Sequence, residues 1–167
     1  MQVNRRDADY HHEQLERMTN ADLLAVAILQ IAYSGSRAQT PDSQRLIQMD
    51  CVAVYMSRSE FIVASNTVKL TDEMVRRALN TLDGSIPRSM TVAIANDLAD
   101  RYAEVKNMHA EMKIVKYFID YNRQMQGISL GVSKPCCSEC AVELDKRGIV
   151  YSTTHSTPNR GEWIAPG

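Results

Sequence analysis

The sequence of 167 residues lacks any apolar run close to the roughly 20 residues that a membrane-spanning helix requires. Its longest apolar stretch, Leu23 to Ala32, is short and is interrupted by Gln30. No apolar segment lies close enough behind the N-terminus to act as a signal peptide. We therefore expect no membrane span, no membrane partner and no export signal within this chain, although a longer parent polypeptide could supply such a signal.

An excess of charge of either sign is also lacking, since 19 basic and 20 acidic residues give a formal net charge of -1. This balance counts against a long surface that tracks phosphates, because such a surface usually carries a strong basic field. A pocket that grips a few nucleotides needs only a few local cations and is not excluded. Basic side chains such as Lys113 and Lys116 could line a path for phosphates, but a solvent-exposed surface is the default assignment.

Cysteine is scarce and unevenly placed: of four cysteines, Cys51 stands alone and three lie between residues 136 and 140. A disulfide scaffold would spread its cysteines along the chain, whereas a Cys-x-x-Cys step indicates metal binding or redox chemistry. We therefore expect a reducing compartment, the cytoplasm, as the place of action. Cys51 is predicted to be a small buried core residue.

Hydrophobic periodicity predicts an N-terminal helical extension over residues 1–45 and a main domain over residues 46–167. The extension contains a helix from Asp22 to Tyr33 with Asn20 as its cap. The order predicted for the main domain is β-β-α-α-α-β-α-β: a hairpin of residues 51–56 and 61–65, helices over 71–82, 90–104 and 109–121, a strand within 127–133, a helix over 138–147 and a strand over 149–152. This order predicts an α/β protein of the α+β type, with a central mixed sheet flanked by helices.

Two short motifs carry residues that are suited to metal chemistry. His109-Ala110-Glu111 starts one predicted helix, and Cys137 and Cys140 lie at the start of another. One imidazole and two thiolates form a zinc-binding set whose fourth position stays open for water, which is typical of catalytic sites. Thiolates at the beginning of a helix are stabilised by the positive end of its dipole. We expect His109, Cys137 and Cys140 to bind Zn²⁺, and Glu111 to reach the bound water.

His-x-Glu followed by Pro-Cys-x-x-Cys is the signature of zinc-dependent nucleobase deaminases. In that chemistry zinc lowers the pKa of a water molecule, and the glutamate passes the water's proton to the ring and to the departing ammonia. The sequence resembles the cytidine deaminase-like superfamily over about residues 46–155, which implies a three-layer fold. The local sequences of residues 109–113 and 131–137, and the tail through Trp163, are similar to deaminase domains of bacterial polymorphic toxins.

The second motif departs from the family pattern by one residue, because Cys137 stands between Pro135-Cys136 and the step to Cys140. Either Cys137 and Cys140 ligate and Cys136 lies beside the site, or Cys136 ligates across a gap of three residues. A Cys-x-x-Cys step fits the start of a helix better, so Cys137 is the predicted ligand.

The resemblance also implies which residues contact a substrate: Asn66, Ala110, Ser133, Pro135, Cys136, His155 and Trp163. Asn66 follows the second strand, where family members place an asparagine that binds the sugar or base. His155 and Trp163 are candidates for hydrogen bonding and stacking with a base. Each prediction has a structural alternative, since Asn66 can cap a turn, Ser133 can end a strand and Trp163 can belong to the core.

Together these features predict the hydrolytic deamination of a nucleobase, most simply cytosine to uracil in single-stranded DNA or RNA. Free cytidine, deoxycytidine or their nucleotides are alternative substrates, and adenine is not excluded as the base. An alternative from another class is a structural-zinc interaction module, against which Glu111 argues because a structural site has no use for an acid there. If the chain is a toxin domain, an immunity protein is an expected partner, and the target cell's cytoplasm is the expected place of action.

Overall fold

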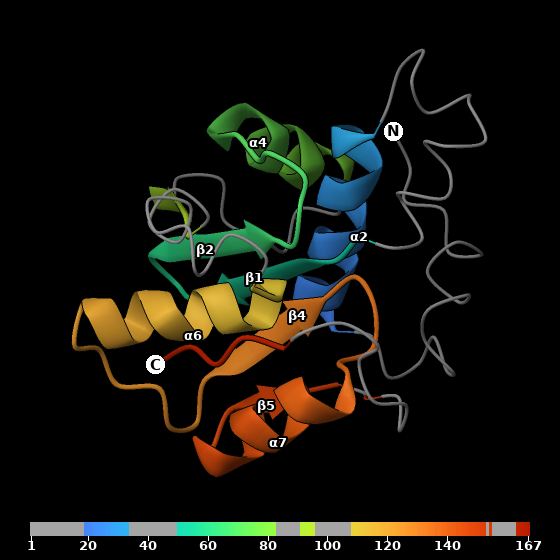
Figure 1. The fold of residues 1–167 in the computed structure, drawn as a ribbon. Helices are drawn as coiled ribbons and strands as arrows, with labels where there is room; N and C mark the ends of the chain where they lie inside the picture. The colour runs from blue at the N-terminus through green and yellow to red at the C-terminus, as the bar shows by residue number, and fades with distance from the viewer. Residues whose placement is uncertain (1–18, 34–49, 83–90, 96–107, 153, 155–162) are drawn as a thin grey trace.

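The computed structural model describes residues 19–33, 50–82, 91–95, 108–152, 154 and 163–167 of the chain. They contain a five-stranded sheet and four flanking helices (Figure 1). In chain order the elements are α2 Asn20–Ala32, β1 Val52–Met56, β2 Glu60–Ser65, α4 Asp72–Thr81, β3 Thr91–Ile94, α6 Ala110–Asp120, β4 Ser129–Val132, α7 Ser138–Lys146 and β5 Val150–Tyr151. No helix in these ranges is long and apolar enough to cross a membrane.

The sheet is mixed, with the strand order β3-β2-β1-β4-β5. The hairpin partners β1 and β2 are antiparallel, and β1 also pairs antiparallel with β4 on its other side. The outer pairs, β2 with β3 and β4 with β5, are parallel. The α+β fold with a central mixed sheet between helices, predicted from the sequence, is confirmed.

Both faces of the sheet are buried, because alternate residues of a strand point to opposite faces. One face carries Ala53 and Ile62, which pack with side chains of α6 and α7. The other carries Val54 and Val63, which pack with side chains of α2 and α4. The sheet is therefore the middle of three layers, as Figure 1 shows.

The prediction of a helix over residues 90–104 is wrong for residues 91–94. Residues 91–94 form β3, which pairs in parallel with residues 60–63 of β2. Thr91, Val92 and Ile94 are β-branched and favour an extended chain, and the edge of β2 supplies the hydrogen-bonding partner. Residues 96–104 of the predicted helix lie outside the described residues.

The helix predicted from Asp22 begins two residues earlier, and its cap is Thr19 and not Asn20. Thr19 Oγ1 accepts a hydrogen bond from Asp22 N at 3.1 Å, and Asp22 Oδ2 accepts one from Thr19 N at 2.9 Å. This is a capping box, in which the side-chain oxygen of each residue accepts a hydrogen bond from the backbone N–H of the other.

The helix α2, predicted to belong to an extension, packs directly on the sheet. Asp22 is fully buried, and its Oδ1 accepts a hydrogen bond from Val132 N at 2.8 Å. A Cβ atom at Gly131 would lie 2.1 Å from the backbone of Ala21, so only glycine allows this approach. The predicted boundary at residue 46 lies outside the described residues, but α2 shares a core with β1, β2 and α4.

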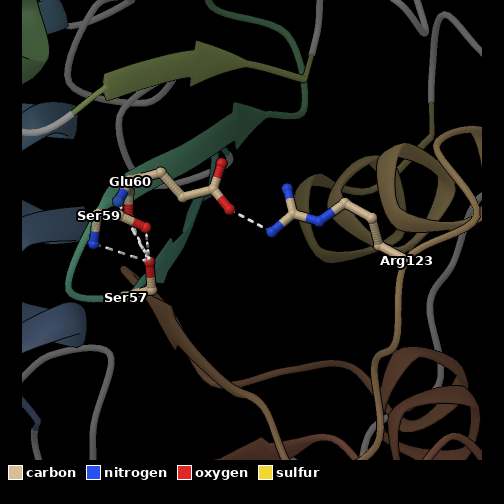
Figure 2. Close-up of polar contacts among 4 residues, drawn as sticks. All are labelled: Ser57, Ser59, Glu60 and Arg123. Atoms are coloured by element: carbon tan, nitrogen blue, oxygen red, sulfur yellow. Dashed lines mark hydrogen bonds and ion pairs between the residues drawn. The ribbon is translucent and has the colours of Figure 1, made fainter.

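The helix α6, whose start carries the His-Ala-Glu motif, is joined to β2 by an ion pair. At its C-terminal end, the guanidinium of Arg123 pairs with the carboxylate of Glu60 (Figure 2). That guanidinium also lies 4.7 Å from the centre of the Phe118 ring. Figure 2 also shows Ser57 Oγ accepting hydrogen bonds from the backbone of the hairpin turn, including Glu60 N at 3.2 Å. These contacts fix the position of α6 along β2.

Candidate metal centre and adjacent carboxylate

His109 is the N-cap residue of α6, and its side chain makes no capping hydrogen bond. The imidazole is therefore free to face the start of α7. His109 Nδ1 lies 3.3 Å from Cys140 Sγ and 3.5 Å from Cys137 Sγ. The three ligand atoms of His109, Cys137 and Cys140 all lie within 4.8 Å of one another.

The two cysteines are presented by the first turn of α7. Cys137 is the N-cap residue, and its sulfur accepts a hydrogen bond from Cys140 N at 3.5 Å. Cys140 follows in the first turn and is fully buried. An N-cap side chain and one three residues later lie on the same side of a helix end, which is why the Cys-x-x-Cys spacing brings both sulfurs together.

The spacing of these atoms fits a tetrahedral metal site. Zinc bonds of about 2.0 Å to nitrogen and 2.3 Å to sulfur put neighbouring ligand atoms about 3.6 Å apart. The two nitrogen–sulfur distances of 3.3 and 3.5 Å are close to this value. The group of His109, Cys137 and Cys140 could therefore hold a metal ion, as their sequence positions predict.

The electrostatics of the ligand group favour one charged sulfur. The hydrogen bond from Cys140, with help from His109, holds the pKa of the Cys137 thiol well below its usual range. The same contact with Cys137, together with burial, raises the pKa of the Cys140 thiol. The hydrogen bond with Cys137 raises the pKa of His109. The side chains of His109, Cys137 and Cys140 thus share their protons with one another, and a cation placed between them would be stabilised by the negative charge on sulfur.

Glu111 lies in the first turn of α6 and is 3% exposed. Burial raises the pKa of its carboxyl, and the nearby charge of His109 and a hydrogen bond with the Cys136 thiol oppose that rise. A carboxylate at this depth is unusual unless it has a partner or a task. It lies beside the ligand group without belonging to it.

Cys136 and Cys137 have different surroundings. Cys136 is fully buried, and this burial, together with the nearby Glu111 carboxyl, raises the pKa of its thiol. Its carbonyl oxygen accepts a hydrogen bond from Thr154 Oγ1 at 2.7 Å, which holds the chain after β5 against the motif. Of the two alternatives left open by the sequence, the geometry groups Cys137, and not Cys136, with His109 and Cys140. Cys136 lies close enough to Glu111 for the carboxyl to influence the pKa of its thiol.

Asn66 lies directly after β2 and contacts the beginning of α6. Its Oδ1 accepts a hydrogen bond from Ala110 N at 3.2 Å, and its carbonyl oxygen accepts one from Lys113 Nζ at 3.2 Å. The predicted substrate residue Asn66 is thereby brought next to the His-Ala-Glu motif. Its assignment as a substrate contact stays a prediction.

The other predicted substrate contacts have varied positions. Ala110 is fully buried at the start of α6, and Pro135 is half-buried before the cysteines. Ser133 is fully buried, and its hydroxyl accepts a hydrogen bond from Val52 N at 2.9 Å, so it joins β4 to β1. Trp163 is half-buried and donates its indole N–H to Cys140 Sγ at 3.4 Å. His155 lies outside the described residues.

Two charged residues near the site are buried, which the sequence did not predict. Lys113, expected on the surface, is 1% exposed, and Asp50 is 2% exposed. The Asp50 carboxylate accepts hydrogen bonds from Thr67 N and Val68 N, the residues that follow Asn66. Lys113 was detectable in principle, because it stands four residues after His109 and so lies on the same face of α6. Asp50 carries no comparable local signal.

Comparison of the chain with family models, with curated proteins and with solved structures finds no match. A function for this site therefore has to be argued from its residues and their geometry.

Proposed function

We propose that the chain is a zinc-dependent deaminase that converts cytosine to uracil in single-stranded DNA or RNA. The observation that carries this proposal is the buried Glu111 carboxylate beside three potential metal ligands. Three protein ligands leave a tetrahedral ion one position for water, as in catalytic zinc sites, whereas structural sites use four protein ligands. A buried acid next to that position serves catalysis and has no evident use in a structural site.

A bound zinc ion would supply Lewis acidity, which makes a water molecule a strong nucleophile at neutral pH. The protein's own contribution is proton transfer by Glu111. Its carboxylate would accept the proton of the attacking water, deliver it to N3 of cytosine and assist protonation of the amino group as it leaves C4. Each turnover consumes one water and releases one ammonia. Burial raises the pKa of Glu111, which suits a group that must accept a proton and return it.

Asn66 would contribute to binding through the part of its amide that faces away from α6. Because Oδ1 is already bonded to Ala110 N, the amide offers a substrate its Nδ2 hydrogens. Such donors recognise an oxygen acceptor of a sugar or base. The preference for a polymer over a free nucleoside is supported by the resemblance of the motifs to toxin-type deaminases.

The test is a deamination assay on single-stranded DNA, RNA, duplex DNA, cytidine and dCMP, with adenine-containing oligonucleotides alongside. The key variant is Glu111→Gln, which keeps the shape of the side chain and removes the proton acceptor. Its matched control is Glu73→Gln, because Glu73 has the same position in the first turn of α4 but is exposed.

We expect the wild type and Glu73→Gln to convert cytosine in single strands, with duplex a poorer substrate because unpairing costs a few kcal/mol. Glu111→Gln should retain the metal and the fold but lose activity by at least two orders of magnitude, the usual contribution of a general acid–base group. Robust turnover of free cytidine or dCMP, with none on any polymer, would contradict the substrate class. Full activity of Glu111→Gln would contradict the reaction.

A further inference from the structure

Besides its contact with His109 Nδ1, each sulfur of the candidate metal centre accepts a hydrogen bond from one further N–H group. Cys137 Sγ accepts from Cys140 N at 3.5 Å, the ordinary capping contact at the start of α7. Cys140 Sγ accepts from the indole Nε1–H of Trp163 at 3.4 Å. The second donor comes from a residue 23 positions further along the chain.

The N–H groups of Cys140 and of the residue after it are both engaged with Cys137. The N–H of Cys140 is directed to Cys137 Sγ, and the next N–H, from Ala141, donates to the carbonyl oxygen of Cys137 at 2.9 Å. Later N–H groups of a helix bind carbonyl oxygens of the preceding turn. The indole of Trp163 supplies the Cys140 sulfur with a donor from outside α7.

The chain end that carries Trp163 is held at this position by apolar packing. Trp163 and Ile164 pack against the core cluster that contains Cys137, Cys140 and Leu144. Pro166, two residues further on, is also buried. The indole is thus supported on its apolar surface, and its single polar hydrogen is directed to the sulfur.

We infer that Trp163 is a positioning residue of the metal centre, which stabilises the Cys140 thiolate through its indole N–H and thereby strengthens metal binding. The inference rests on the metal site of the proposed function. A hydrogen bond to a coordinating thiolate fixes the ligand's orientation and withdraws charge from the sulfur. Partners of this kind typically contribute 10- to 100-fold in metal affinity or activity. Trp163 has only one donor, so a base stacked nearby would find that donor already engaged.

The experiment is a titration of the metal-free full chain with Co²⁺, which gives a sulfur-to-cobalt charge-transfer band when thiolates coordinate. Zinc affinity is measured in parallel by competition with a chromophoric chelator. Two variants remove the N–H: Trp163→Phe, and replacement of Trp163 by 3-benzothienylalanine, which keeps the shape of the indole. The control is Ile164→Val, which trims the neighbouring apolar contact and leaves the N–H in place.

We expect the wild type and Ile164→Val to bind one Co²⁺ with the same affinity and the same band. Both Trp163 variants should bind about tenfold or more weakly. Their charge-transfer band should move to lower energy, because a sulfur without a hydrogen bond gives up its electrons more readily. A purely structural role of Trp163 would leave the band unmoved in the benzothienylalanine variant.

If the benzothienylalanine variant matches the wild type in both affinity and band, the inference is overturned while the proposed function stands. If the wild type binds neither Co²⁺ nor Zn²⁺ under reducing conditions, the proposed function itself fails, and the inference fails with it. The two failures are therefore distinguishable in one set of titrations.

Discussion

Asp50 fixes the loop after β2, which lies beside the candidate site, and a substitution of Asp50 tests this role directly. Its carboxylate accepts four hydrogen bonds while only 2% exposed. Oδ1 accepts from Cys51 N at 2.8 Å and from Thr67 N at 3.3 Å. Oδ2 accepts from Val68 N at 3.1 Å and from Tyr33 Oη at 2.9 Å. One side chain thus connects the chain after α2, the start of β1 and the loop that follows Asn66.

The change Asp50→Ala removes both acceptor oxygens and with them all four hydrogen bonds. A hydrogen bond to a charged group contributes about 1.5–3 kcal/mol, and the buried bond from Cys51 N belongs in that range. The other three are partly buried, so water replaces some of their loss and about 0.5–1 kcal/mol each is a fair value. We expect Asp50→Ala to lower the free energy of unfolding by about 4 kcal/mol. Asp50→Asn, which keeps one acceptor oxygen, should lower it by about half as much.

The measurement is urea unfolding followed by circular dichroism, with Asp120→Asn as the control. Asp120 forms a surface ion pair with Lys116 within α6, and such pairs contribute less than about 1 kcal/mol. At temperatures where it stays folded, Asp50→Asn should raise KM more than it lowers kcat, because the loop carrying Asn66 loosens while Glu111 stays in place. A loss below about 1 kcal/mol for Asp50→Ala would refute the assignment of this carboxylate as the anchor of the loop.

Three further predictions concern the metal centre and a nearby lysine. Cys137→Ser should lose the metal and the activity, whereas Cys136→Ser should keep most of the metal, because Cys136 lies near Glu111 and outside the ligand group. Elemental analysis of both proteins measures the bound metal, and the reverse outcome would exchange the roles of the two cysteines. Removing the metal with a chelator should lower the melting temperature, because a ligand present at 100 times its Kd stabilises the folded state by about 2.7 kcal/mol. Equal melting temperatures with and without the chelator would argue against a metal site that forms only on folding. Burial lowers the pKa of Lys134 to about 8, below the value near 10.4 of an unfolded lysine. Between these values the unfolded chain binds more protons than the folded one, so stability should rise with pH in that window, and urea unfolding at pH 7.5 and pH 10 should show a smaller rise in Lys134→Met.

Local features of the sequence determined most of the elements and the components of the candidate metal centre. The hairpin could be predicted, over residues 51–56 and 61–65, because two short segments rich in β-branched and aromatic side chains flank a polar turn. The strands observed are residues 52–56 and 60–65. The helix starting at Asp72 could be predicted because Thr71 caps it, a contact within one turn of the chain. His109, Cys137 and Cys140 could be grouped as metal ligands because residue type and the position at a helix start are both readable locally. The role of Glu111 follows from the same motif and stays a prediction.

Tertiary structure decided the features that depend on distant partners. Residues 91–94 became a strand because the edge of β2 was available to pair with them, which a sequence window of helical length cannot reveal. Lysine is normally a surface residue because of its charge. Lys113 is nevertheless buried, because its ammonium donates a hydrogen bond to the carbonyl oxygen of Asn66, 47 positions away. Trp163 donates to Cys140 for a similar reason, since only folding brings the chain end to α7. Hydrophobic periodicity and helix capping involve residues within one or two turns of the chain and can therefore be predicted from the sequence. The burial of a side chain and its distant hydrogen-bond partners depend on contacts that form only when the layers pack.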